Sequence, residues 1–157
     1  MTSVDKLLAE YLRRQRGKGF EKFEPYGWQK EWLNSDRKMV VALCANQVGK
    51  STTIAYKASM AARCLYPDWY TGVKITDRAP VIFVVGLTSE EVRDSIQTKL
   101  IGPNMDDPGG GMIPPEDIIR MTKRSNVPGS ADTIFVRHPL GMAQIVLKTA
   151  EQGRERL

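Results

Sequence analysis

The chain has 157 residues, of which 41% are hydrophobic, and this is enough for one globular domain with its own core. Its two cysteines, Cys44 and Cys64, form neither a zinc-ligand pattern nor a disulfide framework, and the sequence has no apolar leader and no membrane-length apolar run. These absences favour a reducing cytoplasm, and the net charge of +5 is compatible with a polyanionic partner without requiring one.

Residues 1–22 are predicted to contain an amphipathic helix. Apolar side chains recur at helical spacing over residues 4–12, and basic residues crowd positions 13–18. Two interpretations have equal weight. The helix is either an arm that binds DNA or a partner, or a docked helix whose cations stabilise the negative end of its own dipole.

An aromatic segment follows at residues 23–32, where Pro25 and Gly27 indicate a turn before a short helix. A glutamine amide can donate to and accept from the edge of adenine, and an aromatic neighbour can cover the ring face. Gln29 precedes Lys50 by a span that helicase-like motors use for an adenine-reading glutamine. The alternative is that the aromatic residues belong to the core and that Gln29 is a surface residue.

The segment 39–45 is apolar and predicts a buried strand, and a helix is expected from Thr52 onward. Gly49, Lys50 and Ser51 therefore fall at a strand-to-helix turn, which is the context of a phosphate-binding loop. In such a loop Lys50 would reach the β- and γ-phosphates, and the Ser51 hydroxyl would ligate Mg²⁺. Backbone amides would come from the loop and the first helical turn: Gln47, Val48, Gly49 and Thr52.

The loop departs from the G-x-x-x-x-G-K-[ST] pattern at its first position, where Cys44 replaces glycine. The details of the turn must therefore differ from the standard loop. The alternative interpretation is a chance Gly-Lys-Ser at the start of a helix.

Two β-α units are predicted in series. The helix after the loop carries Ile54, Ala58, Ala61, Ala62 and Leu65 on one face, and residues 79–86 predict a second buried strand. Thr88 and Glu91 form a capping box for a further helix. This order favours an α/β fold, with a parallel sheet flanked by helices and right-handed crossovers.

The last third of the chain begins with a Gly- and Pro-rich segment, residues 102–115, which is predicted to be a mobile loop that contacts DNA or another subunit. Pro115 is expected to open a short helix through Met121, followed by the basic pair Lys123 and Arg124. Residues 133–137 and 144–148 predict a β-hairpin. His138, at its turn, has no ligand or triad companion in the sequence and is interpreted as structural.

Four motifs together resemble the large terminase subunit of tailed bacteriophages. They are Pro25-Tyr26-x-Trp28-Gln29, Ala45-Asn46-Gln47-x-Gly49-Lys50-Ser51, Gly86-x-Thr88-x-Glu90-x-x-Arg93-Asp94 and Glu151-Gln152-Gly153-Arg154-Glu155. The resemblance runs from about residue 23 to the last residue, and the phosphate loop of that family also often departs from the standard glycine pattern.

The resemblance implies a RecA-like P-loop ATPase domain over residues 23–157, which binds ATP and Mg²⁺. It also implies a motor that moves double-stranded DNA into a prohead and is paired with a nuclease. The implied partners are the portal protein, the small terminase subunit and further copies in a ring. The setting would be the host cytoplasm and, transiently, the portal vertex of the prohead. An arginine ahead of the family's acidic strand would act on a neighbouring subunit, and Arg154 and Arg156 lie at the corresponding place.

The chain lacks the Asp-Glu pair that hydrolysis requires in this family, because the strand at 145–147 is followed by Lys148-Thr149-Ala150. The expectation is that the acidic pair and a nuclease domain lie beyond Leu157, and that this chain alone does not hydrolyse ATP. Two alternatives remain open: a nucleic-acid-binding module with a degenerate loop that uses the basic N-terminal helix and Lys123-Arg124, and another cytosolic P-loop NTPase or kinase.

Overall fold

The structure is a computed structural model, and it describes residues 2, 4–8, 11 and 18–150. After a helical segment at residues 4–8, the helical elements are α2 (Gly27–Leu33), α3 (Lys50–Arg63), α4 (Ser89–Glu91), the π-helix η1 (Val92–Gln97), α5 (Thr98–Ile101) and the 3₁₀-helix η2 (Pro115–Asp117). The strands are β1 (Val81–Gly86), β2 (Ile118–Lys123), β3 (Ala131–His138) and β4 (Gly141–Thr149). None of the described helices is long and apolar enough to cross a membrane.

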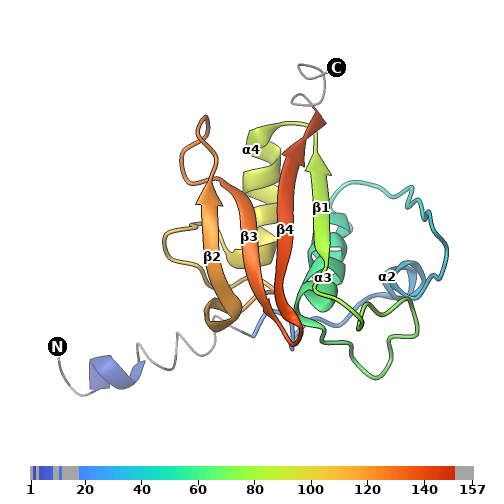
Figure 1. Cartoon of the computed structure of the whole chain (residues 1–157), viewed down its shortest axis with the longest axis horizontal. Helices are drawn as coiled ribbons and strands as arrows, with labels where there is room; N and C mark the ends of the chain where they lie inside the picture. Colours follow the sequence, from blue (N-terminus) through green and yellow to red (C-terminus); the bar gives the residue numbers. More distant parts are fainter. Residues whose placement is uncertain (1, 3, 9–10, 12–17, 151–157) are drawn as a thin grey trace.

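One four-stranded sheet organises the fold, with the strand order β1-β4-β3-β2 (Figure 1). β1 runs parallel to β4, whereas β3 is antiparallel to both of its neighbours. The predicted hairpin is confirmed, because β3 and β4 pair from His138 opposite Gly141 to Thr133 opposite Val146. The α/β class is also confirmed, but the sheet is mixed and not parallel throughout.

α3 and the helical stretch from α4 to α5 cover one face of the sheet, which lies in front of them in Figure 1. α3 packs on β1, β3 and β4, and the continuous helical stretch α4-η1-α5 packs on α3. The side chains between these layers form the core: Val84 of β1, Ile134 and Val136 of β3, and Ile145 and Leu147 of β4, together with Met60, Val92 and Leu100 of the helices. The alternation along each strand therefore directs every second side chain into this core.

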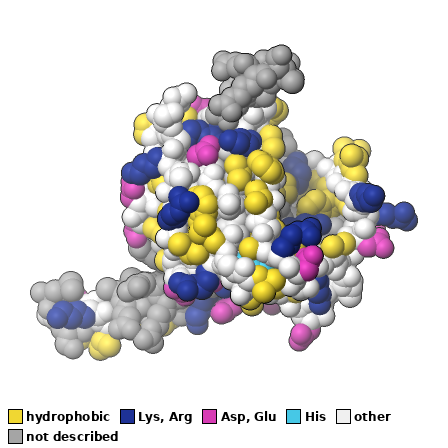
Figure 2. All heavy atoms as spheres, in the orientation of Figure 1, with side chains coloured by type: hydrophobic (Ala, Val, Ile, Leu, Met, Phe, Trp, Pro, Cys, Tyr) yellow, Lys and Arg dark blue, Asp and Glu magenta, His cyan; other side chains and the backbone are white. Residues whose placement is uncertain are grey.

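The opposite face of the sheet is open, and Figure 2 shows hydrophobic side chains gathered over it. Val81, Phe83 and Val85 of β1 are 54%, 64% and 59% exposed, and they alternate with the inward-facing Val84. The strand predicted at 79–86 is therefore present as β1, but the prediction that it is buried is wrong for one of its two faces. β1 is an edge strand with one solvent-facing side, and an uncharged run cannot distinguish that from a central strand.

The predicted buried strand at 39–45 is also wrong. This segment has no regular secondary structure, and Met39, Val41 and Leu43 are 82%, 71% and 94% exposed. No described strand pairs with it. Apolar β-branched residues favour an extended backbone, but a ladder forms only where a partner edge is in reach, and the sequence does not specify that edge.

The segment 102–114 has no regular structure, as predicted, but the prediction that it is mobile finds no support. Gly109 and Ile113 donate backbone hydrogen bonds to Ile101 and Leu100 of α5, with N to O distances of 2.7 and 2.8 Å. A Cβ at Gly111 would lie 2.4 Å from the Leu100 backbone. The glycine lets the loop pack against the helix end, and it buries residues 111–114.

The predicted helix from Pro115 to Met121 is limited to one 3₁₀ turn, Pro115–Asp117, after which the chain enters β2. Proline starts the turn as expected. Ile118, Ile119 and Met121 then continue as a strand, because β3 offers a complementary edge along Ile118–Lys123.

Candidate nucleotide-binding site

The predicted phosphate loop leads directly into α3, with Gly49 as the N-cap and Lys50 as the first helical residue. Gly49 has φ +88° and Gln47 has φ +61°, so the backbone turns through the left-handed region twice within three residues. A Cβ at Gly49 would lie 2.9 Å from Nε2 of Gln29. The local turn therefore requires glycine at 49 for its conformation and for its close approach to α2.

Lys50 folds back over the loop that precedes it. Its Nζ donates hydrogen bonds to the carbonyl oxygens of Cys44, at 3.1 Å, and Ala45, at 2.9 Å. Glycine is therefore not needed at position 44 for this contact, because the Cys44 backbone provides the acceptor. The ammonium group is held beside the helix start, where an anion would compete with neutral carbonyl oxygens for it.

The first turn of α3 has no side-chain cap and no acidic residue. Its amide groups therefore face the loop without a carboxylate that would neutralise the positive end of the helix dipole. Ser51 and Thr52 are half-buried in this turn, while Gln47 is exposed and Val48 half-buried in the loop before it. This donor set, amides plus one ammonium group, fits a phosphate group.

Gln29 lies next to this loop but does not face a ligand. It is 1% exposed, its Oε1 accepts from the Tyr26 amide at 2.8 Å, and its Nε2 donates to Thr53 Oγ1 at 2.8 Å and to Gly49 O at 3.4 Å. Both ends of the amide are already used. The geometry therefore gives Gln29 a different role from the predicted reading of adenine, because it links the start of α2 to the start of α3.

A half-buried lysine, Lys57, lies on α3 about two helical turns after Lys50. Lys57 Nζ lies 4.7 Å from the centroid of the Trp32 ring, in a cation–π contact that joins α3 to α2. Burial lowers the pKa of Lys57, because the charged form loses hydration.

An aromatic cluster anchors the segment before α2 to α3. Phe20 and Phe23 each lie 4.5 Å from Tyr56, measured between ring centroids, and Trp69 lies 6.1 Å away. Burial raises the pKa of the Tyr56 hydroxyl to about 12. The cluster holds the chain that leads into α2 against the helix that carries Lys50.

The two residues of the basic pair proposed for nucleic-acid contact, Lys123 and Arg124, differ in their exposure to solvent. Lys123 is exposed, but the Arg124 side chain is only 3% exposed and donates to Ser89 Oγ at 3.1 Å and to the Leu147 carbonyl. Asp132 lies 3.9 Å from the guanidinium group. Arg124 therefore braces the end of β4 against α4, and the alternative of a nucleic-acid surface at Lys123-Arg124 loses one of its two cations.

Gln97 is a buried polar residue that the sequence analysis missed. It is fully buried, donates to Gly129 O and accepts from the Ala131 amide, with both distances at 2.8 Å. It thereby pins the turn between β2 and β3 to the helical stretch. Only its position beside Ile96 on a helix with a buried face hinted at this role.

His138 is 4% exposed, and its Nδ1 accepts the Leu140 amide at 3.1 Å across the β3-β4 turn. This bond agrees with its interpretation as a structural residue. Arg154 and Arg156 lie outside the described residues, as do most of the basic positions 13–18. The part of the N-terminal helix that is described exposes Val4, Leu7 and Leu8, by 71%, 66% and 54%.

Comparison with known proteins found a similarity to a phage terminase. The chain is 30% identical to the large terminase subunit of Salmonella phage P22, over an alignment of 158 positions that covers 85% of this chain and 31% of the relative.

The chain is similar to a terminase large subunit. It spans about a third of the length of this curated terminase. No protein-family model and no solved structure matches the chain. The similarity to the terminase agrees with the resemblance noted from the motifs.

Proposed function

We propose that this chain is the ATP-binding part of a viral DNA-packaging motor, with a P-loop ATPase domain of the RecA-like type. The loop at residues 44–50 carries the proposal, because Lys50 Nζ lies 2.9 to 3.1 Å from two loop carbonyls at the uncapped start of α3. The similarity to a terminase large subunit supports the choice of a packaging motor among P-loop proteins.

Each loop residue has a distinct task in this proposal. Lys50 exchanges its carbonyl partners for the β- and γ-phosphate oxygens of ATP, and the amides of residues 47–52 hold the remaining oxygens. The Ser51 hydroxyl would contribute one ligand to Mg²⁺. Mg²⁺, when bound, would neutralise charge that develops on the phosphoryl group. Among the described residues no group of three His, Cys, Asp or Glu side chains could hold a metal ion. Within the described part of the chain, the Ser51 hydroxyl and the phosphate oxygens of the nucleotide would therefore be the ligands of Mg²⁺.

The motor assignment brings further proposals. Double-stranded DNA would be the moved substrate, and the portal protein, the small terminase subunit and further copies in a ring would be partners. The motor would act in the host cytoplasm and at the portal vertex of the prohead. ATP hydrolysis, paired with a nuclease, would belong to the protein as a whole. Arg154 or Arg156, with Arg154 preferred, would reach the phosphates held by a neighbouring subunit.

Calorimetric binding of ATP and inorganic triphosphate, each with Mg²⁺, tests the phosphate site. Lys50→Ala should weaken both ligands by at least about tenfold, because charge-assisted hydrogen bonds are each worth about 1.5–3 kcal/mol. Lys99→Ala is a matched control, because Lys99 is exposed on α5 and its loss changes the net charge by the same amount.

The control variant should bind both ligands within about twofold of wild type. Similar losses for Lys50→Ala and Lys99→Ala would mean that Lys50 acts only through net charge. That result, or the absence of triphosphate binding by wild type, would overturn the site.

A further inference from the structure

The sheet face opposite to α3 carries an apolar patch on its β1 side. Val81, Phe83 and Val85 of β1 point away from the core and are each more than half exposed. Phe83 pairs in register with Val146 of β4, which lies outside the core cluster and on the same face. Figure 2 shows hydrophobic side chains gathered over this face of the molecule. We call Val81, Phe83, Val85 and Val146 the outer apolar patch.

The composition of the outer apolar patch is not that of a sheet face covered only by water. Antiparallel strands with one solvated face alternate apolar and polar side chains, whereas parallel strands are usually covered on both faces. β1 and β4 form the parallel pair of this sheet, and β1 has no polar or charged side chain over Val81–Gly86. An exposed patch of this kind typically marks a contact with another molecule. We therefore expect a second layer over β1 and β4 in the assembled protein.

Two arginines lie on the same face, on the strands that are further from β1. Arg120 of β2 pairs in register with Phe135 of β3, and its guanidinium carbon lies 3.6 Å from the centroid of that ring. Arg137 is exposed and follows Phe135 by two residues, so it points to the same face of the sheet. Neither guanidinium group forms an ion pair with a described residue. The face therefore offers two positive charges without a carboxylate partner.

The charge of this face favours an acidic protein segment over the other candidate occupants. A second copy of this chain would bring a net charge of +5 to a face that is already positive. Nucleic acid would neutralise the arginines, but its phosphates would leave the exposed valine and phenylalanine side chains without a complementary surface. An amphipathic helix with acidic residues beside its apolar stripe complements both parts of the face.

The dimensions of the outer apolar patch match a short helix. β1 has six residues and is therefore about 20 Å long. A helix of about 14 residues has the same length. Because the strand order is β1-β4-β3-β2, a helix that lies along β1 and β4 has one flank next to β3, on the side of Arg137 and Arg120.

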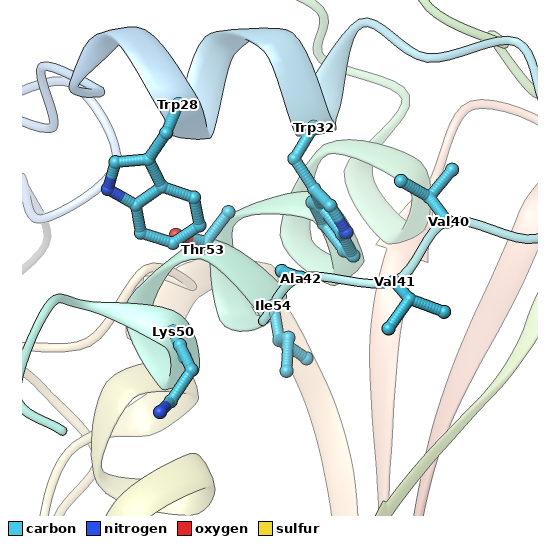
Figure 3. Close-up of a pocket in the computed structure, with 8 residues that line it drawn as sticks. All are labelled: Trp28, Trp32, Val40, Val41, Ala42, Lys50, Thr53 and Ile54. Carbon is cyan, nitrogen blue, oxygen red and sulfur yellow. The ribbon is translucent and has the colours of Figure 1, made fainter. Parts of the chain in front are cut away.

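We propose that the outer apolar patch, together with Arg120 and Arg137, is a docking surface for an acidic amphipathic helix of a partner protein. The apolar stripe of the helix covers β1 and β4, and carboxylates on one flank pair with the two arginines. This surface is separate from the pocket of about 300 Å³ beside Lys50, which is lined by Trp28, Trp32 and other residues outside the patch (Figure 3). The proposal therefore does not depend on the proposed function.

Fluorescence anisotropy with two labelled synthetic peptides tests the docking surface. Both peptides are helices of about 14 residues with a leucine stripe at helical spacing, and the stripe is flanked by glutamate in one peptide and by lysine in the other. The glutamate peptide should bind wild type at least about tenfold more tightly than the lysine peptide. Phe83→Ser should weaken the glutamate peptide by at least about tenfold, because it removes the largest side chain of the patch.

A charge reversal separates a local contact from an effect of net charge. Arg137→Glu should weaken the glutamate peptide by about fivefold and strengthen the lysine peptide by a similar factor. Lys99→Glu is the matched control, because Lys99 is exposed on α5, at the opposite face of the sheet, and its reversal changes the net charge equally. This control should change either affinity by less than about twofold. Triphosphate binding should be the same in all of these proteins, so it reports on the nucleotide site independently.

Several results would overturn the docking surface. They are the absence of binding of the glutamate peptide to wild type, equal binding of the two peptides, an unchanged affinity in Phe83→Ser, and equal effects of Arg137→Glu and Lys99→Glu. Self-association of wild type in sedimentation experiments that Phe83→Ser abolishes would assign the face to a second copy instead. A duplex oligonucleotide that displaces the glutamate peptide, and whose affinity does not change in Phe83→Ser, would assign the face to nucleic acid.

Discussion

Replacement of Gln29 by alanine tests whether this residue supports the phosphate loop, as its geometry indicates. The change removes the acceptor of the Tyr26 amide and the donor to Thr53 Oγ1 and Gly49 O, at 2.8, 2.8 and 3.4 Å. Each such bond contributes about 0.5–1.5 kcal/mol, and a partly buried amide that loses its acceptor adds a desolvation cost. The gain in helix propensity from alanine offsets only a few tenths of a kcal/mol. The free energy of unfolding should therefore fall by about 2–4 kcal/mol.

Urea denaturation followed by far-UV circular dichroism measures this loss, through the midpoint and the slope of the transition. Gln144→Ala is the matched control. Its side chain lies on the open face of the sheet and makes no hydrogen bond to another described residue, so its replacement should cost within about 0.5 kcal/mol. A loss for Gln29→Ala as small as that of the control would refute the bridging role.

Ligand binding by the same variant separates support from base reading. A loosened loop weakens ATP and inorganic triphosphate by the same factor, because both use the loop amides and Lys50. An adenine contact would weaken ATP alone. A loss confined to ATP would therefore return Gln29 to the role first predicted from its spacing.

Two further predictions concern Tyr56 and the C-terminal arginines. The pKa of Tyr56 is raised from 10.0 to about 12, so the native state holds this proton more tightly than the unfolded state does. The free energy of unfolding should therefore decrease as the pH rises from about 10 through 12. Tyr56→Phe should make this decrease smaller in denaturation curves measured across that pH range, and an unchanged dependence on pH would contradict the prediction. In a form of this protein that hydrolyses ATP, an Arg154→Ala variant should bind ATP but not turn it over. Mixing this variant with Lys50→Ala subunits should restore part of the ATPase activity, because each subunit supplies the residue that its neighbour lacks. If neither the Arg154 nor the Arg156 variant is rescued in this way, no arginine of this pair acts across subunits.

The local conformation of the chain could be predicted from the sequence wherever neighbouring residues alone decide it. Gly49, Lys50 and Ser51 begin α3 because glycine permits the left-handed turn and the following residues favour a helix. Thr88 caps the next helical stretch by accepting the Glu91 amide at 3.2 Å, as the capping pattern predicts. The β3-β4 hairpin follows from two short apolar runs, residues 133–137 and 144–148, on either side of a turn.

Only the tertiary structure decided which side chains are buried or hydrogen-bonded and which segments pair as strands, because burial and pairing depend on residues far apart in the chain. The segment 39–45 has the composition of a buried strand, but no described strand pairs with it, and its alternate side chains face solvent. Gln29 and Arg124 look like surface residues available to a ligand, yet each is buried and bonded to groups 20 or more residues away. The two indoles beside Lys50 form a pocket only because α2 packs over α3, and the local pattern of residues along each helix does not reveal how the two helices pack.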